Sequence, residues 1–418
     1  MNERLLQFIW QHLYFNREQL TTQNGQSLQI IYQGSLNSNQ GPDFLHAKIL
    51  INNIIWAGNV ELHIKTSDWK KHGHTNDEHY NNIILHVVWE HDEHEQQNIP
   101  VLELKNRISA SLLQRYYELM QQHTFIPCEQ QLQLVSDLVW SSWKERMIAE
   151  RLYEKNEKIN QLLKATNQHW EETFWQMLAR NFGITVNADA FESIAKTIPV
   201  TILAKYKNQI HQLEALLLGQ AGLLNEKFTE DYPIMLQKEY LFLQKKHQLQ
   251  PSKQLLSFLR MRPGNFPSIR LAQLAMLIHQ SSHLFSKIVE AEDFNNIKQL
   301  LAVTANDYWH YHYMINEPTG FRKKQLGNMM IENIIINTII PVLFAYAQHH
   351  NNENLKQKAI QWLQQLPKEK NNITQKWEAA GITHQTAFDS QALLYLKKNY
   401  CNKKLCLNCA IGNSILKK

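Results

Sequence analysis

The sequence predicts an α+β protein in which a small mixed α/β unit precedes a large all-α region. Short apolar runs of strand length occupy residues 28–104, whereas Leu, Ile, Trp and Phe recur at helical spacing from Ser109 onward. Gly and Pro are scarce, at 13 and 11 of 418 residues, which favours long helices over an all-β fold. We therefore expect an α/β domain over residues 1–107, a helical domain over 108–398 and a cysteine-containing tail over 399–418.

The α/β domain is expected to begin with a helix, because Leu5, Ile9 and Leu13 recur at helical spacing. Asn52-Asn53 is typical of a tight hairpin turn and should join two strands. A short helical segment is expected to start at Ser67-Asp68-Trp69. The predicted order is helix, three strands, helical connection and two strands, with the strands at 28–32, 44–51, 54–65, 83–89 and 99–104.

Charge and hydropathy restrict the partners of the chain. Lys and Arg outnumber Asp and Glu by 43 to 38, and the resulting net charge of +5 permits a nucleic-acid partner without demanding one. No uninterrupted apolar run reaches the roughly 18–20 residues of a membrane span, and we expect residues 334–347 to form a buried helix. The first residues lack the features of a signal peptide. We expect a cytoplasmic protein with no membrane partner, and the sequence identifies no protein partner.

One predicted strand carries an unusual row of ionisable side chains. Successive side chains of a strand point to opposite faces, so Glu61, His63 and Lys65 share one face and an apolar row occupies the other. Such groups are costly to bury unless they are solvated, paired or bound to an ion. We expect the apolar row to face the core and the polar row to line a solvated site.

Asp43 follows Pro42 at the entry to the preceding strand and gives Glu61 a partner. Two carboxylates on neighbouring strands can hold Mg²⁺ or Mn²⁺ between them. Such a cation polarises a phosphodiester and helps to form the attacking hydroxide, while His63 or Lys65 would stabilise charge. The alternative is structural: Asp43 caps a turn and Glu61 pairs with Lys65 on a solvated sheet face.

Histidines are concentrated around this strand. In the connection that follows it, His74 and Asp77 are additional candidates for ligands or a general base, whereas His72 is expected to be exposed. His86 lies inside an apolar strand, where a hydrogen-bonded core histidine is expected. Seven of the 20 histidines fall in this segment: His63, His72, His74, His79, His86, His91 and His94.

The four cysteines form a second candidate metal site. Cys401, Cys406 and Cys409 have the spacing C-x4-C-x2-C, and the remaining cysteine is Cys128. Four thiols of which three are grouped fit a tetrathiolate centre that holds Zn²⁺ or an iron–sulfur cluster. The alternative is three reduced thiols on the tail and one buried Cys128.

A Pro-Gly turn in the helical region is flanked by Arg260, Arg262 and Arg270. A helix that opens at about Ser268 could present guanidinium and amide donors to the phosphates of nucleic acid. The alternative is an interhelical corner whose arginines pair with acidic residues.

Two resemblances follow from these motifs. Residues 1 to about 105 resemble the PD-(D/E)XK nuclease superfamily, with Pro42-Asp43 and Glu61-Leu62-His63 at the two halves of its motif. That resemblance implies a core of helix, three strands, helix and strand, and His63 stands where the superfamily usually has Lys. Nearly the whole chain is similar to the bacterial domain-of-unknown-function family 2851, on the segments Gly41-Pro42-Asp43-Phe44, Val60-Glu61-Leu62-His63, Ser67-Asp68-Trp69, Arg262-Pro263 and Cys406-Leu407-Asn408-Cys409-Ala410-Ile411-Gly412.

The leading hypothesis is a metal-dependent phosphodiesterase, a nuclease acting on DNA or RNA. A second hypothesis is a non-catalytic scaffold that binds nucleic acid or protein through a degenerate nuclease-like module. A third is a zinc hydrolase that uses His63, His74 and Asp77.

Overall fold

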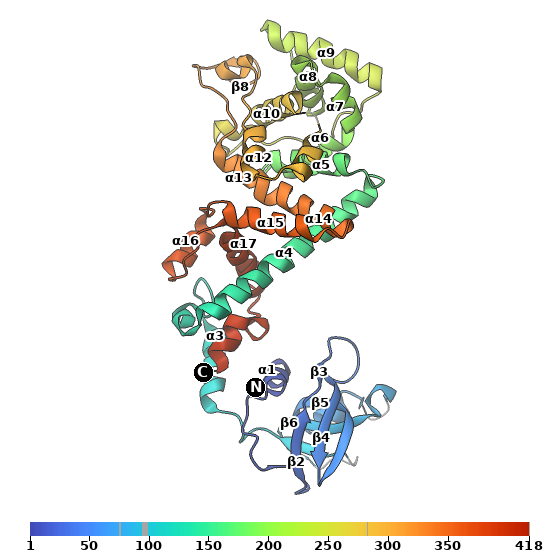
Figure 1. Ribbon diagram of the computed structural model, residues 1–418, viewed down its shortest axis with the longest axis vertical. Helices are drawn as coiled ribbons and strands as arrows, with labels where there is room; N and C mark the ends of the chain where they lie inside the picture. Colours follow the sequence, from blue (N-terminus) through green and yellow to red (C-terminus); the bar gives the residue numbers. More distant parts are fainter. Residues whose placement is uncertain (75–76, 94–98, 282, 418) are drawn as a thin grey trace. The chain divides into compact units, whose positions relative to one another are not determined.

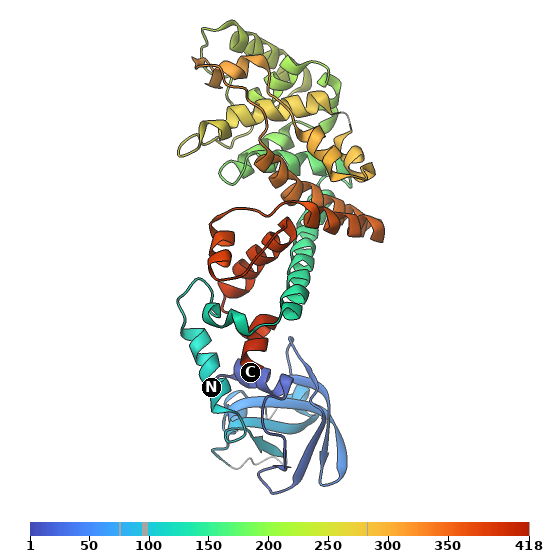
Figure 2. The ribbon, with the colours of Figure 1, turned by 60° about the vertical axis from the view of Figure 1, so that its left-hand side comes forward.

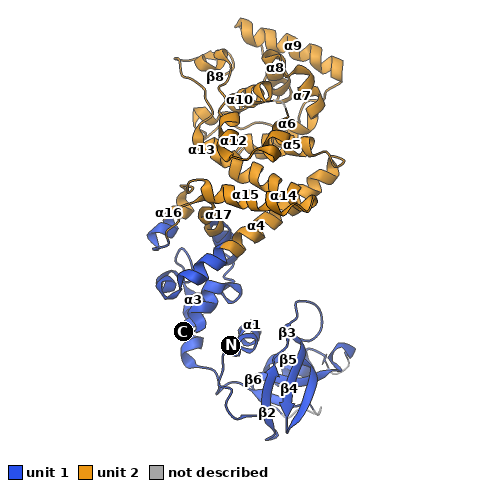
Figure 3. Cartoon of the chain, in the orientation of Figure 1, with its two compact units in different colours: residues 1–144, 376–382, 394–418 blue, residues 145–375, 383–393 orange. Residues whose placement is uncertain are grey.

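The computed structural model describes residues 1–74, 77–93, 99–281 and 283–417. The chain falls into two compact units, coloured separately in Figure 3. Unit 1 combines residues 1–144 with 376–382 and 394–418, and unit 2 holds 145–375 and 383–393. Both the α/β segment and the cysteine-containing tail expected from the sequence lie within unit 1, so the expectation of a mixed α/β unit followed by a largely helical region is confirmed.

Unit 1 is built on one mixed sheet of seven strands in the order β1-β2-β4-β5-β6-β7, with β3 paired to β4 (Figure 1). The pairs β2/β4 and β4/β5 are antiparallel, whereas β5/β6 and β6/β7 are parallel. The strands are β1 Leu20–Thr21, β2 Ser27–Tyr32, β3 Ser35–Leu36, β4 Phe44–Ile51, β5 Ile54–Lys65, β6 Ile83–Glu90 and β7 Val101–Glu103.

The β4–β5 hairpin sets the register of the site. Asn52 and Asn53 both adopt left-handed φ angles, 47° and 66°, as the predicted tight turn requires. Ile51 then faces Ile54, and a β-bulge between Phe44 and Ala47 shifts the register by one residue, so that Phe44 faces Val60. This register places the residue that precedes β4, Asp43, opposite Glu61 of β5.

Helix α1 (Glu3–His12) lies against the sheet in contact with β5 (Figures 1 and 2). It begins at Asn2, whose side chain accepts the Leu5 N–H at 2.9 Å, and it buries Leu5, Leu6, Phe8, Ile9 and Trp10. The sequence predicted this helix from its apolar spacing. Two short helical segments, α2 (Asp68–Lys71) and η2 (Glu78–Tyr80), form the connection from β5 to β6.

The polar row of β5 is not the solvated wall that alternation suggested. Glu61 and His63 are only 5% and 1% exposed, and the apolar neighbour Leu62 is 1% exposed. The β5–β6 connection covers the polar face, since the ring of His63 lies edge-on to Trp69 and stacks with His74. Because the strand is buried on both faces at Glu61 and His63, these ionisable side chains are costly to bury without hydrogen-bond or ionic partners.

The remaining elements of unit 1 are helical. The long helix α4 (Asp137–Ala165) begins in unit 1 and continues into unit 2. The others are α3 Ala110–Gln121, η3 Glu129–Leu134, η7 Lys397–Cys401, η8 Cys406–Asn408 and α18 Ala410–Lys417. Helix α16 (Asn372–Ala379) begins in unit 2 and ends in unit 1.

Unit 2 is mainly helical around an apolar core. It contains the helical stretch Asn328–His349, which has the length and hydropathy of a membrane span. Of the most apolar 18-residue window in this stretch, 72% is buried inside the protein. The expected buried helix at 334–347 is therefore confirmed. The elements of unit 2 are α5 Trp170–Phe182, α6 Ala188–Thr197, α7 Val200–Tyr206, α8 Ile210–Gln220, α9 Asp231–His247, η4 Pro263–Asn265, α10 Pro267–Gln280, α11 Leu284–Glu290, α12 Phe294–Leu301, η5 Asp307–Tyr311, β8 His312–Met314, β9 Glu317–Pro318, α13 Asn328–Ile334, η6 Ile335–Ile339, α14 Ile340–His349, α15 Glu353–Gln365 and most of α17 Ala387–Leu396.

Candidate metal centre

Backbone N–H groups of Asp43 and Leu62 hold the carboxyl groups of Asp43 and Glu61 next to each other. The Asp43 N–H donates to Glu61 Oε2 at 3.0 Å, and the Leu62 N–H donates to Asp43 Oδ2 at 3.1 Å. Gln7 of α1 donates its side-chain amide to Asp43 Oδ1 at 2.8 Å. Three of the four carboxylate oxygens thus accept protein hydrogen bonds, and Glu61 Oε1 is the one that faces the histidines.

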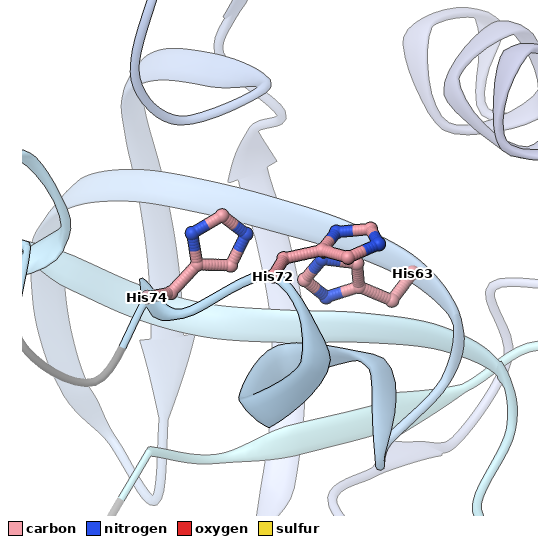
Figure 4. Close-up of side chains that lie close together, drawn as sticks. All are labelled: His63, His72 and His74. Atoms are coloured by element: carbon pink, nitrogen blue, oxygen red, sulfur yellow. The ribbon is translucent and has the colours of Figure 1, made fainter.

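Three histidines from two segments gather close to one another (Figure 4), and two of them, His63 and His74, lie near this oxygen. His63 projects from β5, whereas His72 and His74 come from the connection that follows α2. His63 Nε2 lies 3.1 Å from His72 Nδ1 and 3.6 Å from Glu61 Oε1. His74 Nε2 lies 3.5 Å from the same Glu61 oxygen.

These separations match the edges of a metal coordination sphere. Four tetrahedral ligands at bonds of about 2.0–2.1 Å lie roughly 3.3 Å from one another. Donor atoms of His63, His72 and His74 all lie within 4.8 Å of one another, so one ion can reach all three. In addition, His74 Nε2 is buried without a hydrogen-bond partner. A buried polar atom in that state is costly, and a metal ion would satisfy it.

A fourth histidine orients the first. His63 Nδ1 lies 2.9 Å from Nε2 of His86, which stands on the neighbouring strand β6 directly opposite Glu61. When the second nitrogen of a ligating histidine is hydrogen-bonded, its tautomer and ring orientation are fixed. His86 is fully buried, and its predicted role as a hydrogen-bonded core histidine is confirmed.

Burial perturbs the acid–base properties of these groups. It raises the pKa of both Asp43 and Glu61, and the Asp43 carboxylate raises that of Glu61 further. Burial, together with the neighbouring imidazoles, lowers the pKa of His63 to about 2. His63 is therefore neutral at neutral pH, which is the form that binds a metal. The carboxyl groups of buried Glu61 and partly buried Asp43, close to the neutral imidazole of His63, form a site in which a cation would be strongly favoured.

Aromatic side chains hold the connection in place. Tyr80 stacks on His74 with ring centroids 3.9 Å apart, and Trp69 contacts the same histidine edge-on at 5.5 Å. Trp69 is 4% exposed. These contacts position His74 against β5.

Comparison with known sequences places the chain in a family. The sequence profile of the family described as "Protein of unknown function (DUF2851)" matches residues 3–372. The chain belongs to this family. No curated protein and no solved structure matches it. The resemblance to PD-(D/E)XK nucleases therefore gains no support from these comparisons.

In this DUF2851 protein, two of the sequence-predicted site residues lie apart from the cluster of donor atoms. The ammonium group of Lys65 lies 4.0 Å from Asp92, and its side chain is 48% exposed. Asp77 caps η2 and pairs with His79 at 2.7 Å near the surface. Their roles in catalysis stay predictions.

Sequence reasoning underrated His72. It expected an exposed residue outside the site, and His72 is indeed exposed, yet its ring nitrogen faces His63. The signal was available in the spacing His72-Gly73-His74, because two histidines separated by one glycine can turn toward one ion. His94, which belongs to the same histidine-rich segment, lies outside the described residues.

The three arginines of the helical region differ in their surroundings. Arg270 is buried and donates to Gln273 at 3.0 Å and to Asn265 at 2.6 Å, so its partners are amides and not the acidic residues expected for a corner. Arg260 and Arg262 are exposed beside η4. The phosphate-binding role of this segment stays a prediction.

Proposed function

We propose that the cluster in unit 1 is a metal centre that hydrolyses phosphodiester bonds in nucleic acid. The observation that carries the proposal is the gathering of nitrogen atoms of His63, His72 and His74 within 4.8 Å of one another. Glu61 Oε1 lies 3.6 Å from His63 Nε2 and 3.5 Å from His74 Nε2. The buried Nε2 of the partly exposed His74, which has no hydrogen-bond partner, supports the proposal. Asp43 supplies a second carboxyl group beside the first.

The donor set favours one group of ions. Imidazole suits Zn²⁺ and other transition metals, whereas sites made of oxygen alone suit Mg²⁺. Three histidines with one carboxylate therefore favour Mn²⁺ or Zn²⁺ over Mg²⁺. When bound, such an ion would polarise the phosphodiester and lower the pKa of a coordinated water.

The chain's own residues supply the remaining functions. His63, His72 and His74 would hold the ion, and His86 would fix the tautomer of His63. Glu61, whose Oε1 lies 3.5–3.6 Å from His74 and His63, would supply a carboxylate ligand. Asp43 accepts hydrogen bonds from Leu62 and Gln7, which hold its carboxyl group next to Glu61. Because burial raises the pKa of Asp43, this carboxyl group is suited to accept a proton near neutral pH.

Two further features support nucleic acid as the substrate. The order of α1, the antiparallel strands β2, β4 and β5, then α2 and the parallel strand β6, is the element order that the sequence resemblance implies for a nuclease core. The net charge of +5 is compatible with a polyanionic substrate.

The proposal is tested by cleavage of single- and double-stranded DNA and RNA with metal-free full-length protein, after addition of Mn²⁺, Zn²⁺ or Mg²⁺. We expect cleavage with Mn²⁺ or Zn²⁺. Loss of a residue that hydrogen-bonds to a metal ligand lowers activity by about 10- to 100-fold. Glu61→Gln and His74→Ala remove ligands themselves and should lower the cleavage rate by about 100-fold or more.

Lys105→Ala is the matched control, because Lys105 lies in the same unit and pairs with Glu90 at the surface. We expect it to keep most of the activity. Absence of cleavage by the wild type with every metal, or equal cleavage by wild type, Glu61→Gln and His74→Ala, would favour the non-catalytic scaffold instead.

A further inference from the structure

The four cysteines occupy one region of unit 1 although they come from distant parts of the sequence. Cys128 immediately precedes η3, and Cys409 immediately precedes α18, which packs against η3. Cys406 begins η8, which also contacts α18. Cys401 ends the π-helical turn η7, which packs against η8. The fold therefore brings Cys128 to the tail, which the sequence alone left open.

The four cysteines are largely shielded from solvent and none is in a disulfide. Cys128, Cys406 and Cys409 are 7–9% exposed, and Cys401 is partly exposed. Burial raises the pKa of every one of these thiols, and each is raised further by the charge of at least one other cysteine of the group, except Cys409. Four largely buried thiols whose charges affect one another's pKa values have the arrangement of a thiolate metal centre.

The backbone around Cys409 is organised to stabilise a thiolate. The N–H groups of Ile411 and Gly412, at the start of α18, are directed at its sulfur and lower its pKa against the effect of burial. Hydrogen bonds from backbone N–H groups to sulfur are a recurrent feature that tunes metal–thiolate sites.

Gly412 explains why this loop can close so tightly. A Cβ atom at this position would lie 2.2 Å from the carbonyl oxygen of Cys406, a distance that real Cβ atoms do not adopt. A glycine is thus required for α18 to approach the Cys406 backbone. The close packing fixes Cys406 and Cys409 relative to each other.

The spacing of the sulfur atoms distinguishes two kinds of centre. Four thiolates on one Zn²⁺, at bonds of about 2.3 Å, lie roughly 3.8 Å apart. All four cysteines belong to the described part of the chain. There, the group of possible ligand atoms that lie within 4.8 Å of one another consists of the three histidines and contains none of these sulfur atoms. A four-iron cluster binds each thiolate to a separate iron and so holds the sulfur atoms farther apart.

We propose that Cys128, Cys401, Cys406 and Cys409 are the ligands of a [4Fe–4S] cluster that ties the segment before η3 to the tail of the chain within unit 1. The gathering of four largely buried cysteines from distant segments carries this proposal, together with the finding that no three of their sulfur atoms, all within the described ranges, form a group within 4.8 Å. It is independent of the proposed hydrolase activity. Lys397 and Lys404 lie close enough to Cys401 and Cys406 to offset part of the negative charge.

The test is the metal and sulfide content of full-length protein purified without oxygen and reconstituted with iron and sulfide. We expect about four irons and four acid-labile sulfides per chain, with the broad visible absorption of an iron–sulfur cluster. Zinc as the tightly bound metal, or iron below one atom per chain after reconstitution, would overturn the proposal.

Variants locate the cluster. Cys128→Ser should lose most of the iron and the visible absorption, whereas His74→Ala, at the other site, should keep both. If Cys128→Ser retains the wild-type iron content, Cys128 is not a ligand and the proposal is wrong. Because a cysteine variant could fail to fold, the content of the wild-type protein decides the matter by itself.

Discussion

His74 is the residue that links packing to chemistry in this molecule. Its ring is held between Tyr80 and Trp69, and its Nε2 points toward Glu61 without a hydrogen-bond partner. The sequence predicted His74 as a candidate ligand in the histidine-rich connection that follows β5. It did not predict the burial of Glu61 and His63, because that burial depends on the β5–β6 connection folding back over the sheet.

A second buried acid lies in unit 2, and its titration should be visible in stability. Glu214 is fully buried and accepts a hydrogen bond from the Tyr232 hydroxyl at 2.6 Å. Burial raises the pKa of Glu214 from 4.5 to about 7. Between these two values the folded protein keeps a proton that the unfolded chain has lost. The stabilisation of the folded protein by protonated Glu214 is thus complete below pH 4.5 and is lost as the pH rises through about 7.

The corresponding loss in the free energy of unfolding is about 3 kcal/mol at most. Denaturant titrations from pH 4.5 to 8, followed by tryptophan fluorescence, should show this decrease in the wild type. Glu214→Gln cannot titrate and should lack that part of the pH dependence. Identical pH profiles for the two proteins would show that Glu214 keeps an ordinary pKa.

At the scale of elements, local patterns predicted the N-terminal order well. Alternation, the Asn52-Asn53 turn and the apolar run at 83–89 gave β4, β5 and β6 with nearly the observed bounds. The hairpin turn alone would place Asp43 opposite Leu62. The β-bulge between Phe44 and Ala47 moves the pairing to Glu61, and the sequence did not predict this bulge. The approach of Cys128 to the tail was beyond reach, because it results from helix packing between segments that are distant in sequence.

The start of the parallel pairing between β5 and β6 depends on Gly58. A Cβ atom there would lie 2.5 Å from Ile84 Cγ2 and 2.6 Å from the Asn82 carbonyl oxygen. Gly58→Ala should force the two strands apart and lower the free energy of unfolding by about 1–3 kcal/mol, as other overpacked sites do.

Chemical denaturation measures this effect, and the metal affinity should fall with it because Glu61 and His63 follow on the same strand. Gly320→Ala is the control, since nothing lies within 4 Å of a Cβ at that position. A Gly58→Ala variant as stable as Gly320→Ala would mean that the β5–β6 register does not depend on this close approach.

At the scale of the whole molecule, unit 1 holds both candidate metal sites and unit 2 is a mainly helical body. The histidine–carboxylate cluster belongs to the mixed sheet, and the four cysteines belong to the helical part of the same unit. The net charge of +5 of the chain and the exposed Arg260 and Arg262 of unit 2 are compatible with nucleic-acid binding by the helical unit. Such binding stays a prediction.

The most direct test is binding of Mn²⁺ to metal-free full-length protein, with free ion measured by electron paramagnetic resonance. Mn²⁺ prefers oxygen and nitrogen ligands, so the cysteines should contribute little. We expect a single tight site that is lost in Glu61→Gln and His74→Ala and retained in Lys105→Ala. Equal Mn²⁺ binding in the wild type, Glu61→Gln and His74→Ala, or no tight binding of either Mn²⁺ or Zn²⁺ by the wild type, would contradict a metal centre at the β4–β5 register.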